Sequence, residues 1–390
     1  MAIARNAAGI AAAAAISVAA FSAANAAGVS KDEILLGTHS DLSGVAAVWG
    51  VASVNGMRMR FEEANKAGGV HGRKIRLVVE DNQYQVPRAV QAANKLLNRD
   101  KVFAMVGALG TPMNNAVMKR QLGKKVPNLF PFSSSKQMAE PLHPLKFQSF
   151  SSYYAQIRAG ANLWAMEKGK KNHCVMYQDT DFGKEILDAA VDQAKKTGAK
   201  IVATSAHRPT DQDFVAAVTK LKAADCDVIF MGTIVRDTII PYATARKLKW
   251  GADFVGTVAS YDVFVAGAKG GITNGYQAMT SFQLAYPDNK SEQVRNWITS
   301  YKEKFGKGPN QAAQLGYINA DITVRALENA GKDLTAKSLV AALENTKDYR
   351  DAFGGPAISF SADNHQGSSE AFLAKVENSR WVTLTGSLGY

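Results

Sequence analysis

The sequence predicts an α/β protein made of two doubly wound lobes of similar size. Three observations support this prediction. Strand-like and helix-like segments alternate through most of the chain, a pattern typical of a parallel sheet with helices on its faces. The alternation begins again near residue 151, after one complete unit. The chain also has 390 residues, more than one ordinary hydrophobic core organises.

The first unit shows the alternation most clearly. Its strands are short apolar runs, and a glycine-rich segment at 68–72 ends its first helix. In chain order, the predicted elements are strand 34–37, a helix to about 67, strand 75–79, helix 89–99, strand 102–107, helix 113–123 and strand 128–132.

The second unit repeats the pattern with similar lengths. Its predicted elements are helix 153–167, strand 174–177, helix 182–197, strand 201–204, helix 214–224, strand 228–232, helix 238–247 and strand 254–258.

The tail departs from this alternation. It contains three amphipathic segments, predicted as helices 291–305, 311–330 and 335–345, and two segments that alternate like edge strands, 358–360 and 371–376. These elements must pack on the two lobes formed by the preceding segments. The chain is therefore expected to cross between the lobes near 285–287 and again near 353–355. The predicted lobes are therefore 27–150 with 286–352, and 151–285 with 353–390. Several crossovers make a hinge, and such lobes bind ligands in the cleft between them.

The N-terminus predicts export. Arg5 precedes a small and apolar run from Ala7 to Ala24, and Ala24-Asn25-Ala26 is an A-x-A cleavage site. This is typical of a secretory signal peptide cleaved after Ala26, which predicts a periplasmic protein. A transmembrane anchor is the alternative, but the run is alanine-rich and too weakly apolar for a spanning helix.

Charge and cysteines narrow the possible partners. The formal net charge is +12, but lysines and arginines are scattered and no nucleic-acid-binding motif accompanies them. The charge therefore supports only long-range attraction of anionic ligands. Cys174 and Cys226 each stand before an apolar run; they form either a disulfide or two separately buried thiols, and neither possibility implies a metal site.

Catalytic signatures are absent. The sequence has no nucleophile elbow, zinc-protease motif, Walker A or dinucleotide-binding glycine motif, and its six histidines occur singly. Asp179, Asp181 and Glu185 could form a carboxylate set, but Asp181 before a predicted helix is better explained as an N-cap. The sequence therefore predicts neither an enzyme nor a cofactor.

Two turns that follow predicted strands carry glycine and hydroxyl side chains. They are 107–112 (GALGTP) and 131–135 (PFSSS), and each leads toward a helix. Exposed N–H groups and hydroxyls at a helix N-terminus bind a carboxylate without an arginine. Ordinary helix capping would look the same locally. Two such turns in one lobe favour a ligand-binding role.

Across almost the whole chain, the sequence resembles the branched-chain amino-acid-binding proteins of ABC importers, the type I periplasmic binding proteins. The segments that carry the resemblance are 34–50 (ILLGTHSDLSGVAAVWG), 55–72 (NGMRMRFEEANKAGGVHG), 89–98 (AVQAANKLLN), VFAMVGALGT, LFPFSSS, DFGKEILDAA and GGPAISFSADNHQG. The resemblance implies two Rossmann-like lobes joined by three crossovers and a ligand in the interlobe cleft. It also implies a monomer that delivers its ligand to an ABC permease in the inner membrane.

The resemblance assigns roles to individual residues. Trp49 resembles the aromatic residue that covers the ligand from the first lobe, and Phe182 occupies the place of one that closes from the second lobe. Thr111 resembles the hydroxyl that meets the ligand carboxylate, and Ser133 and Ser134 fall in the second carboxylate-binding turn. Gly110 and Phe132, from the same two turns, are also predicted to bind the ligand.

One departure from the family concerns charge. Where amino-acid-binding members hold the ligand ammonium with acidic residues, this sequence has Tyr153 and Val258. A buried ammonium needs acceptors, preferably an anion. We therefore expect a carboxylate ligand without an α-ammonium, such as an aromatic or similarly flat acid. The alternatives are an amino acid held by Asp179, Asp181, Asp237 or Asp262, and a sensory receptor of the same fold.

Overall fold

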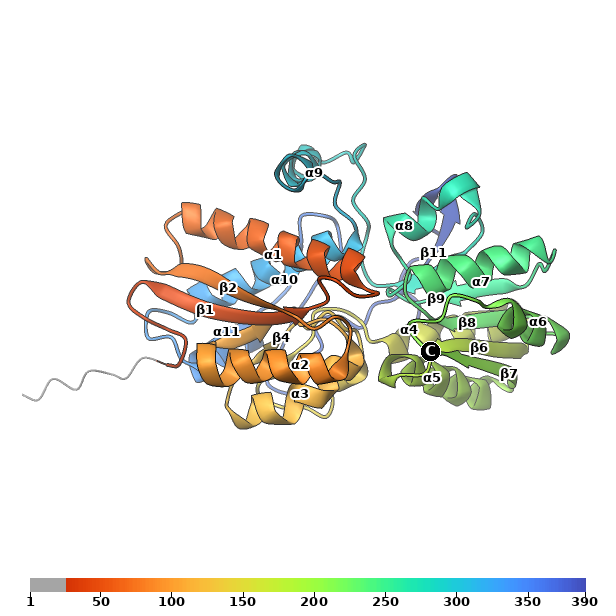
Figure 1. The fold of residues 1–390 in the computed structure, drawn as a ribbon, viewed down its shortest axis with the longest axis horizontal. Coiled ribbons are helices and arrows are strands. Elements are labelled where there is room, and N and C mark those ends of the chain that lie inside the picture. The colour runs from red at the N-terminus through yellow and green to blue at the C-terminus, as the bar shows by residue number, and fades with distance from the viewer. Residues whose placement is uncertain (1–25) are drawn as a thin grey trace, which may run out of the picture.

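The computed structural model describes residues 26–390 as two α/β lobes lying end to end (Figure 1). Residues 1–25 of the predicted signal peptide, which spans 1–26, lie outside the described residues. Among residues 26–390, no helix has the length and apolar character needed to cross a membrane. The predicted fold class, two doubly wound α/β lobes, is confirmed.

The first lobe contains a five-stranded parallel sheet in the order β2-β1-β3-β4-β5. Its strands are β1 Glu33–Ser40, β2 Lys74–Asp81, β3 Ala104–Val106, β4 Asn128–Leu129 and β5 Lys146–Phe147. The order of its first four strands matches the alternation of apolar runs and helices. The two residues of β5 are too few to show a pattern, and this strand was not predicted.

Helices cover both faces of this sheet (Figure 1). They are α1 Ala47–Lys66, α2 Val86–Asn94 with its π-helical continuation Lys95–Asp100, α3 Thr111–Gly123, and the three tail helices α9 Glu292–Phe305, α10 Gln311–Asn329 and α11 Ala336–Glu344.

Helices α1 and α10 cross at two glycines. A Cβ atom added at Gly56 would lie 2.0 Å from the Ala313 carbonyl oxygen, and one added at Gly316 would lie 2.1 Å from the Ser53 carbonyl oxygen. Only glycine allows such a close approach of two helix backbones. The tail helix α10 therefore packs directly on the first helix of the chain.

The second lobe contains a seven-stranded sheet in the order β12-β11-β10-β9-β8-β6-β7. Its strands are β6 Asn172–Gln178, β7 Lys200–His207, β8 Val228–Gly232, β9 Asp253–Gly256, β10 Gln277–Thr280, β11 Phe372–Glu377 and β12 Arg380–Thr383. Its helices are α4 Tyr153–Asn162, continued by Leu163–Glu167, then α5 Asp181–Thr197, α6 Val215–Ala223, α7 Arg236–Lys247 and α8 Val263–Ala266.

Two strand predictions for the tail are wrong. Strand β11 pairs with both β10 and β12, so it is not an edge strand. Segment 358–360 forms only an isolated bridge, between Ile358 and Tyr349. Its alternating apolar side chains instead pack into the first lobe, where the Phe360 ring lies 5.4 Å from the Phe147 ring.

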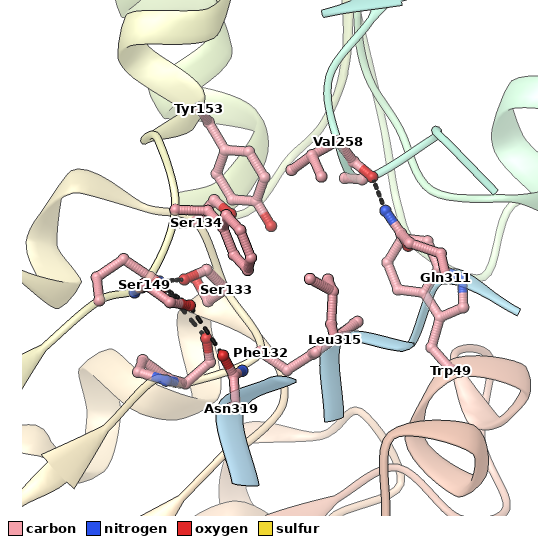
Figure 2. Close-up of a pocket in the computed structure, with 14 residues that line it drawn as sticks. Trp49, Phe132, Ser133, Ser134, Ser149, Tyr153, Val258, Gln311, Leu315 and Asn319 are labelled. Atoms are coloured by element: carbon pink, nitrogen blue, oxygen red, sulfur yellow. Dashed lines mark hydrogen bonds between the residues drawn. The ribbon is translucent and has the colours of Figure 1, made fainter. Parts of the chain in front are cut away.

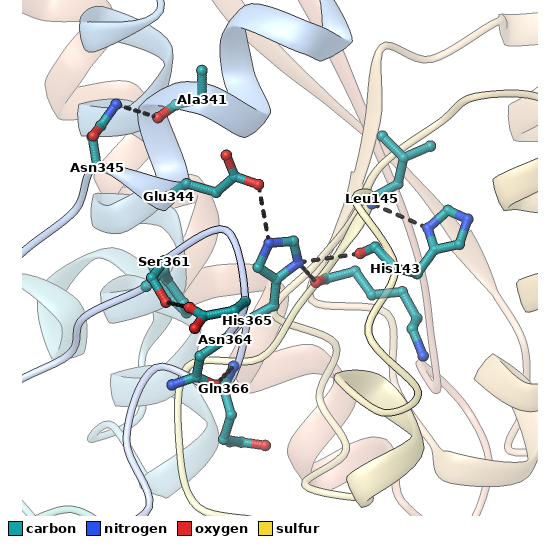
Figure 3. Close-up of polar contacts among 12 residues, drawn as sticks. His143, Leu145, Ala341, Glu344, Asn345, Ser361, Asn364, His365 and Gln366 are labelled. Carbon is teal, nitrogen blue, oxygen red and sulfur yellow. Dashed lines mark hydrogen bonds and ion pairs between the residues drawn. The ribbon is translucent and has the colours of Figure 1, made fainter.

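The segment 361–366, which contains His365, contacts the first lobe (Figure 3). The His365 ring stacks on Phe147 at 3.8 Å, and its Nδ1 donates to the Lys146 carbonyl at 2.9 Å. Its Nε2 lies 3.3 Å from a carboxylate oxygen of Glu344 at the end of α11. We therefore propose that the third crossover follows Gln366, in place of the predicted position near 353–355.

A disulfide joins Cys174 and Cys226, with 5.8 Å between their Cα atoms. It connects β6 to the segment that enters β8, and these two strands are neighbours in the sheet. The alternative of two separate thiols is wrong.

Candidate functional site

Two adjoining cavities lie between the lobes, beside residues that follow the carboxyl ends of strands in both sheets. Their shared walls are Trp49, Phe132, Tyr153 and Ala259. The space not filled by protein atoms, counted together with solvent at the open sides, is about 360 Å³ in one and about 280 Å³ in the other. Clefts between two domains are a common place for small-molecule sites.

We call the larger cavity the amide chamber, because three carboxamide side chains line it (Figure 2). Besides the shared walls, its lining residues are Pro131, Ser133, Ser134, Gln148, Ser149, Phe150, Val258, Gln311, Leu315 and Asn319. We call the smaller cavity the aromatic chamber. Its remaining walls are Tyr84, Leu109, Gly110, Thr111, Phe182 and Ile234.

All nine residues that the sequence assigned to a ligand site line one or both chambers. Trp49, Phe132 and Tyr153 line both. The structure therefore brings together side chains from segments far apart in the sequence. Their contact with a ligand remains a prediction.

The two glycine- and hydroxyl-bearing turns meet at a pair of hydroxyl groups. Thr111 Oγ1 and Ser133 Oγ lie 2.7 Å apart, because the turns follow the adjacent strands β3 and β4. The backbone amides of Thr111 and Ser134 have no backbone acceptor among residues 26–390, and Thr111 is the first residue of α3. Free amides and hydroxyls at a helix N-terminus form an anion-binding arrangement.

Gly110 shapes this turn. Its φ of +100° belongs to a region that other residues rarely adopt, and an added Cβ would lie 2.6 Å from the Met113 side chain. A larger residue there would be strained by this φ, although the flexible end of the Met113 side chain could move aside.

Aromatic rings form the walls on either side. The Trp49 and Phe132 rings meet edge to face at 5.8 Å, and those of Tyr153 and Phe182 meet edge to face at 5.0 Å. The Tyr153 hydroxyl points into the amide chamber, near Ser134 (Figure 2). Burial raises the pKa of Tyr153, so its phenol stays neutral.

Among residues 26–390, no charged side chain lines either chamber. Of the four acids predicted as alternative ammonium ligands, the two buried ones are hydrogen-bonded to protein groups. Asp262 accepts a hydrogen bond from the Trp49 indole at 3.1 Å, and burial raises its pKa to about 6. Asp237 accepts from the Gln178 amide at 2.8 Å and lies 2.9 Å from His207 Nε2.

The other acids also contact protein groups. Asp179 forms an exposed ion pair with Lys184 at 3.1 Å, and Asp181 accepts from Asn115 of α3 at 2.8 Å. The prediction that Asp181 is an N-cap is wrong: the cap of α5 is Thr180, and Asp181 is the first helical residue. Its carboxylate contacts the opposite lobe instead of its own helix.

Glu185 provides another contact between the lobes. Its carboxylate accepts from the Lys136 amide at 2.9 Å and from the Ser135 hydroxyl. Burial raises the pKa of Glu185. The second lobe therefore directs several carboxylates at first-lobe donors while leaving the chambers uncharged.

The sequence did not indicate the α10 wall of the amide chamber. Gln311, Leu315 and Asn319 are spaced four residues apart and so share one helix face. That periodicity was visible in the sequence. It could not show that this face meets the cleft, because the packing of α10 on α1 depends on contacts between distant segments.

Comparison with known proteins gives consistent matches. A family model described as periplasmic binding protein matches residues 33–380. A Pseudomonas aeruginosa protein named amino acid binding protein is 28% identical over 201 residues, which span 51% of this chain and only 54% of that protein. A Brucella melitensis protein named Leu/Ile/Val-binding protein homolog 3 is 24% identical over 348 residues, 87% of this chain and 91% of that protein.

A solved structure shares the fold. A fatty acid ABC transporter substrate-binding protein from Thermomonospora curvata superposes with a TM-score of 0.83 at 24% identity, covering 94% of this chain and 95% of that one. Because the family model spans nearly all of the described residues, the chain belongs to the periplasmic binding protein family.

Proposed function

We propose that this protein is the substrate-binding component of an ABC importer and that it captures a small carboxylate without an α-ammonium group. An aromatic or similarly flat acid is the proposed ligand type. The proposed partner is a permease in the inner membrane, which receives the ligand from the closed, monomeric protein.

One observation supports this ligand class above the others. The chambers offer a hydroxyl pair and free amides to an anion, while no carboxylate lines them. An ammonium buried without an anionic partner loses several kcal/mol of hydration. Trp49, Phe132, Tyr153 and Phe182 offer ring faces and edges that suit a planar ligand.

A second candidate is an amino acid, and the relatives favour it. The two named above are an amino acid binding protein and a Leu/Ile/Val-binding protein homolog. For this chain, the Tyr153 hydroxyl would have to act as the acceptor, or Asp262 would have to exchange the Trp49 indole for the ammonium. The solved relative that binds fatty acid takes a carboxylate that carries no ammonium.

A thermal-shift screen separates these candidates. It compares benzoate, phenylacetate and hexanoate with leucine, isoleucine and valine. A ligand at 100 times its dissociation constant adds about 2.7 kcal/mol of stability, which is visible as a raised melting temperature. We expect shifts with the acids and none with the amino acids. Micromolar binding of leucine, with benzoate and phenylacetate inert, would establish the amino-acid alternative.

Small-angle scattering tests closure of the lobes. Thr111 and Ser133 belong to the first lobe and Phe182 to the second, so a bound ligand should draw the lobes together and lower the radius of gyration. Identical profiles with and without a saturating ligand would contradict this.

A further inference from the structure

Three carboxamide side chains line the amide chamber, and two of them are fully engaged. Gln148 Oε1 accepts from the Ser149 amide at 2.7 Å, and its Nε2 donates to the Ser133 carbonyl. Asn319 Oδ1 accepts from the Ser149 hydroxyl at 2.9 Å, and its Nδ2 donates to the Phe130 carbonyl at 3.2 Å. Both carboxamides hold the turn that carries the hydroxyl pair.

Gln311 differs from these two. Its Nε2 donates to the Val258 carbonyl, and its Oε1 has no hydrogen-bond partner in the described part of the chain although the residue is only 1% exposed. A carbonyl only accepts, so this bond fixes which end of the amide faces Val258. The remaining end is therefore a buried acceptor in the wall of a cavity. A buried polar group without a partner is rare and calls for a physical explanation.

The position of Gln311 relative to the carboxylate-binding turn is informative. In Figure 2, Ser133 and Ser134 stand on one side of the amide chamber and Gln311 on the other, with the Leu315 side chain directed into the space between them. Val258 and Leu315 are apolar walls of this space. A flat acid held at its carboxylate by the serine turn would direct its far end toward Gln311.

We propose that Gln311 Oε1 accepts a hydrogen bond from a donor at the far end of the ligand, so that the preferred substrates are carboxylic acids bearing a distal hydroxyl or N–H group. This inference rests on the proposed function, because it assumes a carboxylate at the serine turn. Hydroxylated aromatic acids are the simplest compounds that meet both conditions.

The discrimination follows from the cost of an unpaired acceptor. An acid that lacks the distal donor fills the chamber and leaves Gln311 Oε1 without either water or a partner. A site built around such a hydrogen bond selects strongly against the analogue that lacks it. We expect the hydroxylated acid to bind roughly tenfold more tightly than its parent acid.

Titration calorimetry on the full-length mature protein tests this with matched ligands. The pairs are benzoate with 4-hydroxybenzoate and phenylacetate with 4-hydroxyphenylacetate, which differ in the distance from ring to carboxylate. In each series the 4-methoxy acid keeps the oxygen but has no hydrogen to donate. We expect one hydroxylated acid to bind best and its methoxy analogue to lose the advantage.

The variant Gln311→Met keeps the length of the side chain and removes the acceptor. It also removes the hydrogen bond to the Val258 carbonyl and so weakens closure on every ligand. The informative quantity is therefore the ratio of the affinities for the hydroxylated acid and its parent acid. This ratio should fall to about one in Gln311→Met. The exposed Gln91 of α2 provides a matched control, since Gln91→Met should leave the ratio unchanged.

The results can distinguish a failure of the proposed role of Gln311 from a failure of the proposed function. If both members of each pair bind wild-type protein equally, or if the ratio survives in Gln311→Met, the role of Gln311 is wrong while the proposed function stands. If none of these acids binds and leucine does, both proposals fail together. The melting temperature of each variant is measured as a control that the variant is folded.

Discussion

The two lobes present opposite surfaces to the chambers. The first lobe contributes hydroxyls and free amides, concentrated at Thr111, Ser133 and Ser134, whereas the second contributes the apolar groups of Phe182, Ile234 and Val258. We expect the charged end of a ligand to contact the first lobe and its hydrocarbon to lie between rings of both lobes, because Trp49 and Phe132 of the first lobe also line the chambers. The difference lies in the polar groups, which we propose make the first lobe the one that holds the carboxylate.

The acids of the second lobe extend this contrast. Glu185 and Asp262 reach across the interface, one to the Lys136 amide and the other to the Trp49 indole. Both carboxylates are buried, and burial raises the pKa of each. The second lobe therefore has anions at the interface, but they bind protein donors beside the cleft and none lines it.

Adding an anion to the apolar wall of the amide chamber should have the largest effect on ligand affinity. Val258→Asp places a carboxylate in the amide chamber, where it repels an acid ligand and is desolvated on closure. We expect aromatic acids to lose several kcal/mol of binding, more than 100-fold in affinity, while leucine gains measurable affinity. Calorimetry with both ligands checks this, and Val258→Asn controls for shape. Unchanged aromatic-acid binding would mean that Val258 does not face the ligand.

Removing the Thr111 hydroxyl tests the polar wall. Thr111→Val keeps the branched shape and removes a donor to the ligand carboxylate. A hydrogen bond to a charged group contributes about 1.5–3 kcal/mol, so affinity should fall roughly 10- to 150-fold. Thr111→Ser retains the hydroxyl and should restore most of the binding. Equal affinities of the valine and serine variants would place the carboxylate elsewhere.

Trp49 has two contacts, as a ring wall and as the donor to Asp262. Trp49→Ala should weaken binding by about 1–3 kcal/mol through lost apolar and stacking contact. Trp49→Phe keeps a ring but cannot donate to Asp262, so it should fall between wild type and the alanine variant. Calorimetry of the three proteins measures the order of their affinities. An alanine variant with wild-type affinity would mean that Trp49 does not contact the ligand.

The smallest expected effect is a pH dependence of closure. In the closed structure burial raises the pKa of Asp262 to about 6 from an ordinary value of 3.8, and opening the lobes would return it toward that value. Closure then takes up a proton, so the closed form is favoured at low pH and this advantage is lost as pH rises through about 6. The neighbouring Tyr286 stays neutral, since burial raises its pKa.

We expect affinity for an aromatic acid to be roughly tenfold tighter at pH 5 than at pH 7.5. Asp262→Asn should flatten this dependence, and Glu185→Gln should flatten any remainder, because burial shifts the pKa of Glu185 in the same direction. A pH profile identical in Asp262→Asn and wild type would show that Asp262 stays equally buried in the open form.

The sequence predicted most strands and helices of both lobes because apolar runs and helical periods are local patterns, but it missed β5, α8, β10 and β12. It failed where contacts between distant segments determine the local structure. Segment 358–360 alternates like a strand, yet its phenylalanine fills a gap beside Phe147. Strand β12 follows the turn at Asn378 and Ser379, both with positive φ, and covers the edge that β11 was expected to form.

The same limit applies to the site. Turn residues such as Thr111 and Ser133 could be found from the sequence because glycine and hydroxyl groups after a strand form a local pattern, and the resemblance to a family supplied Trp49 and Phe182. Gln311 could not be found in this way. Its significance lies in one unpaired oxygen, which depends on where the Val258 carbonyl falls in three dimensions.

The glycine crossing of α1 and α10 bears on affinity. Helix α1 carries Trp49, and α10 carries Gln311, Leu315 and Asn319, so the backbone contacts at Gly56 and Gly316 fix these walls relative to one another before any ligand arrives. Their ordering entropy is then lost during folding and does not recur at each capture event. We expect this preorganisation to raise the affinity of the uncharged cleft for the proposed ligand without preventing its release when the lobes open.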